Sequence, residues 1–412
     1  MSIENALPQG ALHGIRIVEW AHAHMGPGAG ALLSDLGAEV IHIEQPVIGD
    51  MQRRFTHVFG ANFALGHGRN AIVEDVDRNK KSVAVDLNQP EGKDIIYGLV
   101  KQSDVFLTNM RPKAVARQQM DYETLSQYNS KLIYCQGTTY GEQGPEKDSP
   151  GLEMMGLARA GILLGSAFKD GPPVYPTVGM IDRIGAIGIA FGILAALFAR
   201  ERQGIGQRLS TSMLGWSTNL QAVPVTLAAN TGQDPRPIRR EETNDPLWNV
   251  YRLKDGTWIA LGMIIEGDKF WPKICHAVGR PELAADPRFA SNAKREENRR
   301  ELITLLDEIF ATVGYEEWDR QVKINDFIAT KVNALTDLGT DPQLLENGYI
   351  VELDHKDLGR WKYVPLPIQF DRTPVRIHAC APQIGEHNAQ VLQELLGYSA
   401  ERVEQLRKSK VI

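Results

Sequence analysis

The sequence is poor in the features that mark several large classes of protein. Its 412 residues contain three cysteines, Cys135, Cys275 and Cys380, which are widely separated and odd in number. We therefore expect neither a disulfide framework nor a cysteine-based zinc site, and a reducing, cytoplasmic environment fits best. The first residues, MSIENALPQGALHG, contain neither a basic start nor an apolar segment, so no secretory signal is expected.

The chain also lacks a strong excess of charge and a long apolar run. Lys and Arg number 45 against 51 Asp and Glu, a net charge of −6 that argues against nucleic acid as a partner. The run without polar side chains, Ile184 to Ala199, is shorter than the ~20 residues that cross a membrane, so we expect a buried helix and no membrane partner. Its Gly185, Gly188 and Gly192 each cost roughly 1 kcal/mol of helix propensity, which indicates close packing.

Short apolar segments alternate with potential helices through the first third of the chain. The expected strands are GIRIVEW, AEVIHIE, DVFLTN and KLIYCQG. This order predicts a Rossmann-like parallel α/β sheet. GPGAGALLSDLGAEV predicts a helix through Leu36 that stops at Gly37. It is not the G-x-G-x-x-G pattern, and no acid follows the second strand in the ribose-binding position, so a nicotinamide enzyme is disfavoured.

A polar, turn-rich segment, Asn230 to Pro246, indicates a linker before a second module. There we expect two strands around Asp255–Gly256, and an amphipathic helix in KREENRRELITLLDEIFATV. KYVPLPIQF is strand-like, and GEHNAQVLQELLG predicts a helix that ends at Gly397. The chain thus divides into a large Rossmann-like domain, 1–224 and 336–412, and a smaller α+β domain, 225–335.

Asp182 stands directly before the apolar run, next to Arg183. The free N–H groups and the dipole of a helix start favour an anion, and Asp is a preferred N-cap residue. From these residues alone a capping role is favoured over a catalytic one.

Seven segments in family order resemble the class III CoA-transferases, the family of formyl-CoA transferase and carnitine CoA-transferase. They span most of the chain and are LHGIRIVEW, LLSDLGAEVIHIEQPVIGD, NKKSVAVDLNQPEGKDII, SDVFLTNMRPKAV, LIYCQGTTYGEQGP, DGPPVYPTVGMID and GILAALFARERQGIGQRLSTSM. The resemblance implies a nucleophilic Asp just ahead of a GILAAL helix, which is Asp182 here. It also implies an interlocked dimer in which the smaller domain clasps a partner chain.

Such an enzyme moves CoA from an acyl-CoA donor to a carboxylic acid acceptor without hydrolysis. The resemblance implies that Asp182 attacks the thioester to form an anhydride, and that CoA then converts it to an aspartyl thioester. CoA is thus a substrate, and neither a permanently bound cofactor nor a metal is expected. A metal pair of His22 and His24 is disfavoured because no third ligand is near in the sequence.

Further site residues follow from the same resemblance. Glu153 corresponds to an acidic position near the catalytic Asp, and its alternatives are a role with the acceptor or a simple capping or surface role. His24 and Met25 lie in a loop over the thioester, where His24 would donate a hydrogen bond to an oxyanion. The implied CoA-binding positions are Met25, Gln45, Leu87, Asn88, Asn109, Met110 and Arg117.

Several departures from the family pattern leave alternatives open. Gln45 and Asn88 stand where relatives often carry Arg and Lys, so compensating cations are sought among Arg111, Lys113, Lys80 and Lys81. The glycine-rich lid of formyl-CoA transferase is replaced by REETNDPLWNVYR, so oxalate or formate specificity does not carry over. Trp248 there indicates either a pocket for a bulkier acid or a core residue.

Two competing functions remain. An α-methylacyl-CoA racemase needs a His immediately before the acid in PGLE, where Leu152 stands, and is therefore disfavoured. A non-catalytic partner subunit is favoured mildly by Gln45 and Asn88 and disfavoured by the presence of Asp182. Both a homodimer and a heteromer with a related subunit fit the sequence.

Overall fold

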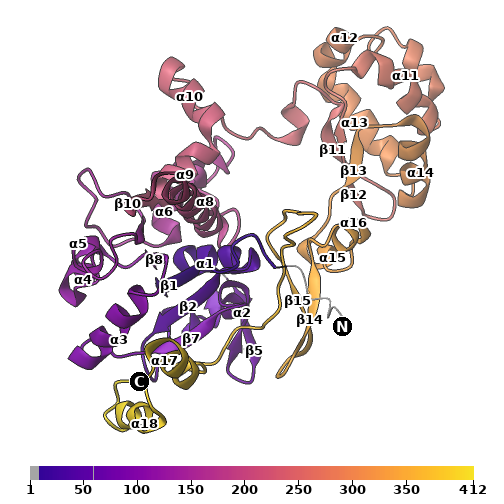
Figure 1. Ribbon diagram of the computed structural model, residues 1–412. Helices are drawn as coiled ribbons and strands as arrows, with labels where there is room; N and C mark the ends of the chain where they lie inside the picture. The colour runs from indigo at the N-terminus through magenta and orange to yellow at the C-terminus, as the bar shows by residue number, and fades with distance from the viewer. Residues whose placement is uncertain (1–8, 59) are drawn as a thin grey trace. The chain divides into compact units, whose positions relative to one another are not determined.

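The computed structural model describes residues 9–58 and 60–412, which form two compact units, each with its own hydrophobic core (Figure 1). The first unit comprises Met1–Leu164, Val174–Pro235 and Pro342–Ile412, and the second comprises Gly165–Pro173 and Arg236–Asp341. Residues 1–8, on which the expected lack of a secretory signal partly depends, lie outside the described residues.

Six parallel strands form the main sheet of the first unit, in the spatial order β10-β9-β8-β1-β2-β7. They are β1 (Arg16–Trp20), β2 (Glu39–Glu44), β7 (Lys81–Ala84), β8 (Val105–Thr108), β9 (Ile133–Thr138) and β10 (Gln207–Ser212). The order reverses at β1, which pairs with β2 on one side and with β8 on the other. The expected Rossmann-like sheet is confirmed, and such a sheet binds ligands beyond the carboxyl ends of its strands at the reversal point.

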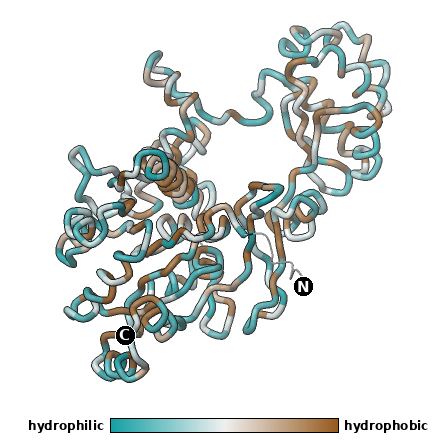
Figure 2. Tube along the Cα trace, viewed as in Figure 1, coloured by the Kyte–Doolittle hydropathy of each residue, from teal (hydrophilic) through white to brown (hydrophobic). Residues whose placement is uncertain are grey.

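Alternate strand residues face two apolar layers, because successive side chains in a strand point to opposite faces. Ile17 and Val105 pack with α1 (Met25–Asp35) and α8 (Met180–Gln203), whereas Val18 and Phe106 pack with α3 (Pro90–Val100) and α17 (Asn388–Leu396). Figure 2 shows the hydrophobic colours along these strands and along α8. The predicted stops after α1 and α17 are confirmed, since Gly37 and Gly397 have φ angles of 97° and 69°.

Helix α8 is longer than its apolar run and is not buried all round. An added Cβ at Gly185 would lie 3.1 Å from Met25 Cε, and one at Gly188 would overlap the Trp216 ring, which confirms the close packing. Phe191 and Phe198, however, are 66% and 67% exposed, so the helix is buried on part of its surface only. By length and composition alone this 24-residue helix could cross a membrane, although half of its most apolar window is buried in the protein.

The first unit has further helices and short strands besides the main sheet. The helices before residue 236 and after residue 341 include α2 (Ala71–Val76), α4 (Pro112–Gln118), α5 (Tyr122–Leu125), α6 (Glu153–Arg159), α7 (Ile162–Gly165), α9 (Met213–Leu220), α10 (Ala222–Thr231), α16 (Pro342–Glu346) and α18 (Ala400–Lys408). The short strands pair as β3 (His57–Val58) with β4 (Ala61–Asn62), β5 (Ala64–Gly66) with β6 (Arg69–Asn70), and β14 (Val351–His355) with β15 (Gly359–Tyr363).

The second unit contains an antiparallel sheet and a group of helices. Its elements are β11 (Trp248–Arg252), β12 (Trp258–Gly262), β13 (Ala329–Lys331), α11 (Gly267–Ala277), α12 (Asn292–Glu297), α13 (Arg299–Phe310), α14 (Tyr315–Asn325) and α15 (Leu335–Leu338). The hairpin around Asp255–Gly256 is confirmed, because Arg252 pairs with Trp258 across it.

Three expectations outside the sheet need correction. The segment KREENRRELITLLDEIFATV forms two helices, α12 and α13, which break at Asn298, rather than one. Only the start of KYVPLPIQF is strand, because β15 ends at Tyr363 and the prolines that follow cannot donate to a sheet ladder. Trp248 is 55% exposed and is therefore not a core residue.

Candidate active site

The predicted site residues of the first unit follow the carboxyl ends of neighbouring parallel strands. His24 and Met25 follow β1, Gln45 follows β2, Leu87 and Asn88 follow β7, and Asn109 and Met110 follow β8. Since β7, β2, β1 and β8 are adjacent in the sheet, one edge of the sheet carries all of these positions. This is the edge at which open α/β sheets bind ligands.

Glu153, the first residue of α6, caps the start of α8. Its Oε2 accepts a hydrogen bond from Gly179 N at 2.8 Å, and its Oε1 accepts one from Ile181 N at 3.1 Å. The Tyr175 hydroxyl also donates to Oε2. The capping alternative for Glu153 is therefore observed, because two of the N–H groups that a helix start leaves free bond to this carboxylate.

Asp182 does not cap α8. The N-cap residue is Gly179, and Asp182 lies within the first turn, where its carboxylate accepts no hydrogen bond from any residue of the described chain. Burial raises the pKa of Asp182 to about 6, and the charge of Glu153 adds to this, whereas His24 and Arg183 act in the opposite direction. Asp182 is thus a half-buried carboxylate, ionised at neutral pH and without a partner that would block its oxygens.

His24 begins α1 and lies against the start of α8. An added Cβ at Gly179 would lie 2.9 Å from His24 Cε1 and 3.1 Å from Nδ1, so the residue at this position must be small. On the other edge of the ring, His24 Nε2 lies 3.4 Å from Asp75 Oδ2. The structure thus brings together the three predicted catalytic residues, His24, Glu153 and Asp182, at one helix start.

The loop that carries His24 is held from two sides. Asn109 Oδ1 accepts from His22 N, and Asn109 Nδ2 donates to His22 O, both at 2.8 Å. The buried Asp50 accepts from Ala23 N at 3.2 Å and lies 3.1 Å from His22 Nδ1. Ala23 has a φ of 60°, a conformation that costs energy for a residue with a Cβ and needs such support. His22 and His24 contact different carboxylates and do not form a shared metal site.

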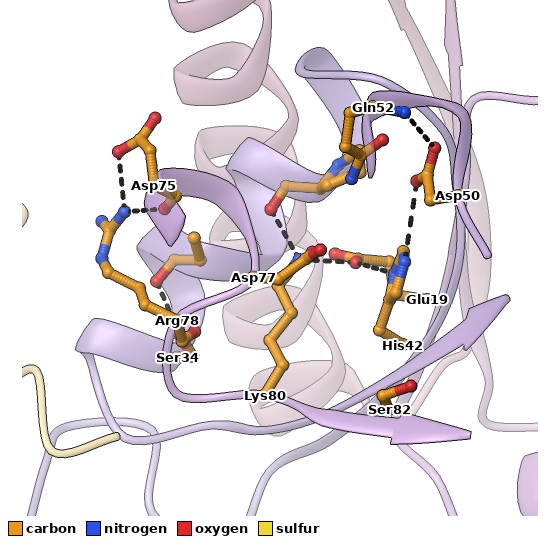
Figure 3. Close-up of polar contacts among 12 residues, drawn as sticks. Glu19, Ser34, His42, Asp50, Gln52, Asp75, Asp77, Arg78, Lys80 and Ser82 are labelled. Carbon is orange, nitrogen blue, oxygen red and sulfur yellow. Dashed lines mark hydrogen bonds and ion pairs between the residues drawn. The ribbon is translucent and has the colours of Figure 1, made fainter. Parts of the chain in front are cut away.

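A buried polar network lies beneath this loop (Figure 3). Lys80 Nζ bonds to Glu19 Oε1 at 2.6 Å and lies 3.3 Å from Asp77 Oδ1, and His42 Nδ1 lies 2.7 Å from Glu19 Oε1. Burial alone would lower the pKa of His42, but the carboxylates of Asp77 and Glu19 raise it to about 9. Glu19, His42 and Asp77 lie close enough together to hold a metal ion, yet the Lys80 ammonium already contacts both carboxylates.

The network corrects one expectation about CoA binding. Lys80 is buried and fully engaged, and Lys81 Nζ bonds to Glu39 Oε1 at 2.7 Å, so neither is a free cation for a phosphate. Leu87 and Met25 are 7% and 2% exposed, which leaves mainly their backbone atoms for contact with a ligand. Gln45 is exposed, and its Oε1 accepts from Ile48 N at 3.3 Å.

A small basic pocket lies at α4. Arg111, Lys113 and Arg117 line it together with Asp148, which lies 3.3 Å from Lys113 Nζ. Asn88 adjoins the same helix, because Gln118 Nε2 donates to Asn88 Oδ1 at 3.0 Å. The structure therefore places two predicted CoA-binding residues, Asn88 and Arg117, at one helix, together with Arg111 and Lys113, two of the cations considered as compensation.

Sequence reasoning missed four residues of the site: Asp50, Asp75, Tyr175 and Arg183. Asp50 and Tyr175 lie inside quoted segments, and Arg183 was named only as the neighbour of Asp182 in the sequence. Asp75 belongs to a short helix outside the quoted segments, and only the folded chain brings it to His24.

Comparisons with known proteins give one consistent result. The model of CoA-transferase family III matches residues 12–388. The chain is 29% identical to (R)-2-hydroxy-4-methylpentanoate CoA-transferase of Clostridioides difficile, over 97% of this chain and 99% of the relative. It is 30% identical to cinnamoyl-CoA:phenyllactate CoA-transferase of Clostridium sporogenes, over 97% and 96%. The crystal structure of a CaiB/BaiF family protein from Brucella suis superposes with a TM-score of 0.84 at 27% identity, over 94% of this chain and all of that one.

Proposed function

The chain belongs to CoA-transferase family III, and on that premise we propose that it transfers CoA between carboxylic acids through covalent intermediates on Asp182. One observation carries the proposal: Asp182 lies at the start of a helix without capping it, because Glu153 performs that role. If Asp182 were needed only to cap the helix, its carboxylate would accept the hydrogen bonds of the first N–H groups of α8. Glu153 accepts them instead.

The proposed reaction begins with two steps that load CoA onto the protein. An Asp182 oxygen attacks the carbonyl carbon of the donor thioester, the C–S bond breaks, and CoA leaves as a thiolate, which gives an acyl-aspartyl anhydride. The thiolate then attacks the Asp182 carbonyl carbon, the anhydride C–O bond breaks, and the donor acid leaves as a carboxylate. The product is an aspartyl-CoA thioester.

Two further steps pass CoA to the acceptor. The acceptor carboxylate attacks the aspartyl thioester and releases the thiolate, which then attacks the acyl carbonyl of the new anhydride. Acyl-CoA forms and the Asp182 carboxylate returns. The four steps need no oxidant, no reductant and no water, and no proton is gained or lost in their sum.

The neighbours of Asp182 have distinct parts in this scheme. Burial disfavours the charged carboxylate, and formation of the neutral anhydride or thioester removes that buried charge. His24 is placed to stabilise an oxyanion from the side of α1, as oxyanion-hole donors do. Arg117, with Arg111 and Lys113, is the proposed site for CoA phosphates, because charge-assisted hydrogen bonds suit these groups.

Other features of the family remain proposals for this chain. We infer an interlocked dimer, or a heteromer with a related subunit, in a cytoplasmic setting and with CoA as substrate rather than as a bound cofactor. Racemase chemistry is disfavoured because Leu152 offers no base next to Glu153. A non-catalytic partner subunit is disfavoured by the free Asp182 carboxylate.

Trapping of the covalent intermediate tests the proposal. The protein is mixed with succinyl-CoA or acetyl-CoA, treated with hydroxylamine or borohydride, digested, and the modified peptide identified by mass spectrometry. We expect modification of Asp182. An adduct on Glu153, or none with any donor, would overturn the assignment. The acceptor panel includes 2-hydroxy-4-methylpentanoate and phenyllactate, for which two relatives are named, together with succinate.

A further inference from the structure

Asp75, on the short helix α2, contacts two cations that flank Asp182. Its Oδ2 lies 3.4 Å from His24 Nε2 and forms an ion pair with the Arg183 guanidinium. Burial alone would raise the pKa of Asp75, but the nearby His24 ring and the charges of Arg183 and Arg78 outweigh it and hold the pKa below its usual range. Asp75 is therefore an anion at neutral pH.

Asp75 is itself fixed by a buried anchor. Arg78 NH1 donates to Asp75 Oδ1 at 3.0 Å, and the same guanidinium donates to both oxygens of the buried Asp35, at 3.0 Å from Nε and 2.7 Å from NH2 (Figure 3 shows Asp75 with Arg78). Arg78 and Asp35 are both fully buried. Buried ion pairs with complete hydrogen bonding keep their geometry, so the Asp75 carboxylate is held in one position beside the site.

This contact also sets the orientation of His24. With Nε2 directed to Asp75, the edge with Cε1 and Nδ1 faces Gly179, at the start of the helix that carries Asp182. Arg183, next to Asp182 in the chain, is likewise bound to Asp75, and the Asp182 oxygens stay free of it.

We propose that Asp75 is a positioning residue for CoA transfer, which holds His24 and Arg183 beside the Asp182 carboxylate. The inference rests on the proposed function of Asp182. The charged and titratable groups that face Asp182 are His24 from α1, Glu153 from α6, Tyr175 from the segment before α8, and Arg183 from α8 itself. Asp75 reaches Asp182 only through the two cations.

Asp75→Asn tests the role, because it keeps the shape and removes the charge that binds both cations. His24 and Arg183 lower the pKa of Asp182, which burial raises to about 6, so release of these cations is expected to raise that pKa further. We expect the acid limb of the pH profile of transfer to move upward from about pH 6, and kcat to fall roughly 10- to 100-fold, as for other losses of positioning. The KM for acyl-CoA is expected to change little, because the proposed phosphate contacts lie at α4.

Asp104→Asn is the matched control. Asp104 is 26% exposed, against 29% for Asp75, and its Oδ1 pairs at 2.7 Å with Arg200 near the other end of the same helix α8. The control variant loses an ion pair to α8 whose carboxylate is about as exposed as that of Asp75. This ion pair lies away from Asp182, at the other end of the helix. We expect it to leave the pH midpoint and kcat unchanged.

A readout without turnover separates this inference from the proposed function. The side-chain carboxyl of Asp182 is followed by ¹³C NMR as a function of pH in substrate-free protein, with Asp182→Asn to assign the signal. A higher midpoint in Asp75→Asn than in wild type supports the positioning role even if no donor is ever turned over. An unchanged or lower midpoint, with a folded variant, overturns it whatever the activity.

Discussion

Asp182→Asn is expected to abolish CoA transfer and at the same time to stabilise the protein at neutral pH. Asn keeps the shape of the side chain but is neither a nucleophile nor able to form the anhydride. The gain in stability follows from the carboxylate itself, because Asp182 accepts no hydrogen bond within residues 9–58 and 60–412 and caps no helix. Its replacement therefore removes a half-buried charge and no bond.

The magnitude comes from the raised pKa. Burial moves the pKa of Asp182 from 3.8 to about 6. A carboxyl with a raised folded-state pKa costs nothing below its unfolded pKa, an increasing amount between the two values, and its full cost above pH 6. At 1.36 kcal/mol for each pKa unit the full cost is about 3 kcal/mol, and partial solvent access lowers it to roughly 1 to 3 kcal/mol.

Calorimetric melting at pH 7.5 and at pH 3.5, at one fixed protein concentration, measures this difference. We expect Asp182→Asn to melt at a higher temperature than wild type at pH 7.5 and at the same temperature at the lower pH, if both proteins remain folded there. A CoA-exchange assay on the same samples is expected to show no transfer by the variant. A variant that is less stable than wild type at pH 7.5, or that retains turnover, refutes the reasoning, because either result means that the carboxylate serves the helix.

Three other outcomes are expected. Arg117→Ala is expected to weaken CoA binding by about 1.5 kcal/mol in titration calorimetry, because the guanidinium is exposed and its charge-assisted hydrogen bond falls at the low end of the usual range. An unchanged affinity would remove Arg117 from the phosphate site. An interlocked dimer buries far more than the ~1,600 Å² of a standard interface, so sedimentation at nanomolar concentration shows no folded monomer, and a stable monomer contradicts the interlock. Transfer in deuterated solvent leaves the α-proton of the acyl group in place, whereas exchange, detected by mass spectrometry, restores the racemase alternative.

The sheet was largely predictable because its central strands are continuous apolar runs. β1, β2, β8 and β9 are buried on both faces, and this is the condition under which a strand stands out from the sequence. β7 and β10 were not predicted as strands. β7 is only four residues long, and β10 is a polar strand at the sheet edge with no fully buried residue, so neither gives a clear signal.

The site was predictable only where a motif carried it. Asp182, Glu153 and His24 came from a family resemblance, and the structure brings them together at the start of α8. Which carboxylate caps the helix could not be read from spacing, because Glu153 precedes α8 by a long segment and reaches it only through the packing of α6. The sequence offered Lys80 as a possible phosphate contact, because no residue near it in the chain shows that its side chain is buried against Glu19.

The division of roles between Glu153 and Asp182 has a consequence for the catalytic cycle. In the proposed mechanism Asp182 is in turn a carboxylate, an anhydride and a thioester, and its ability to accept hydrogen bonds changes at each stage. The hydrogen bonds at the start of α8 do not depend on Asp182, because Gly179 N and Ile181 N bond to Glu153 instead. The adduct on Asp182 can therefore form and leave without breaking a hydrogen bond that starts α8.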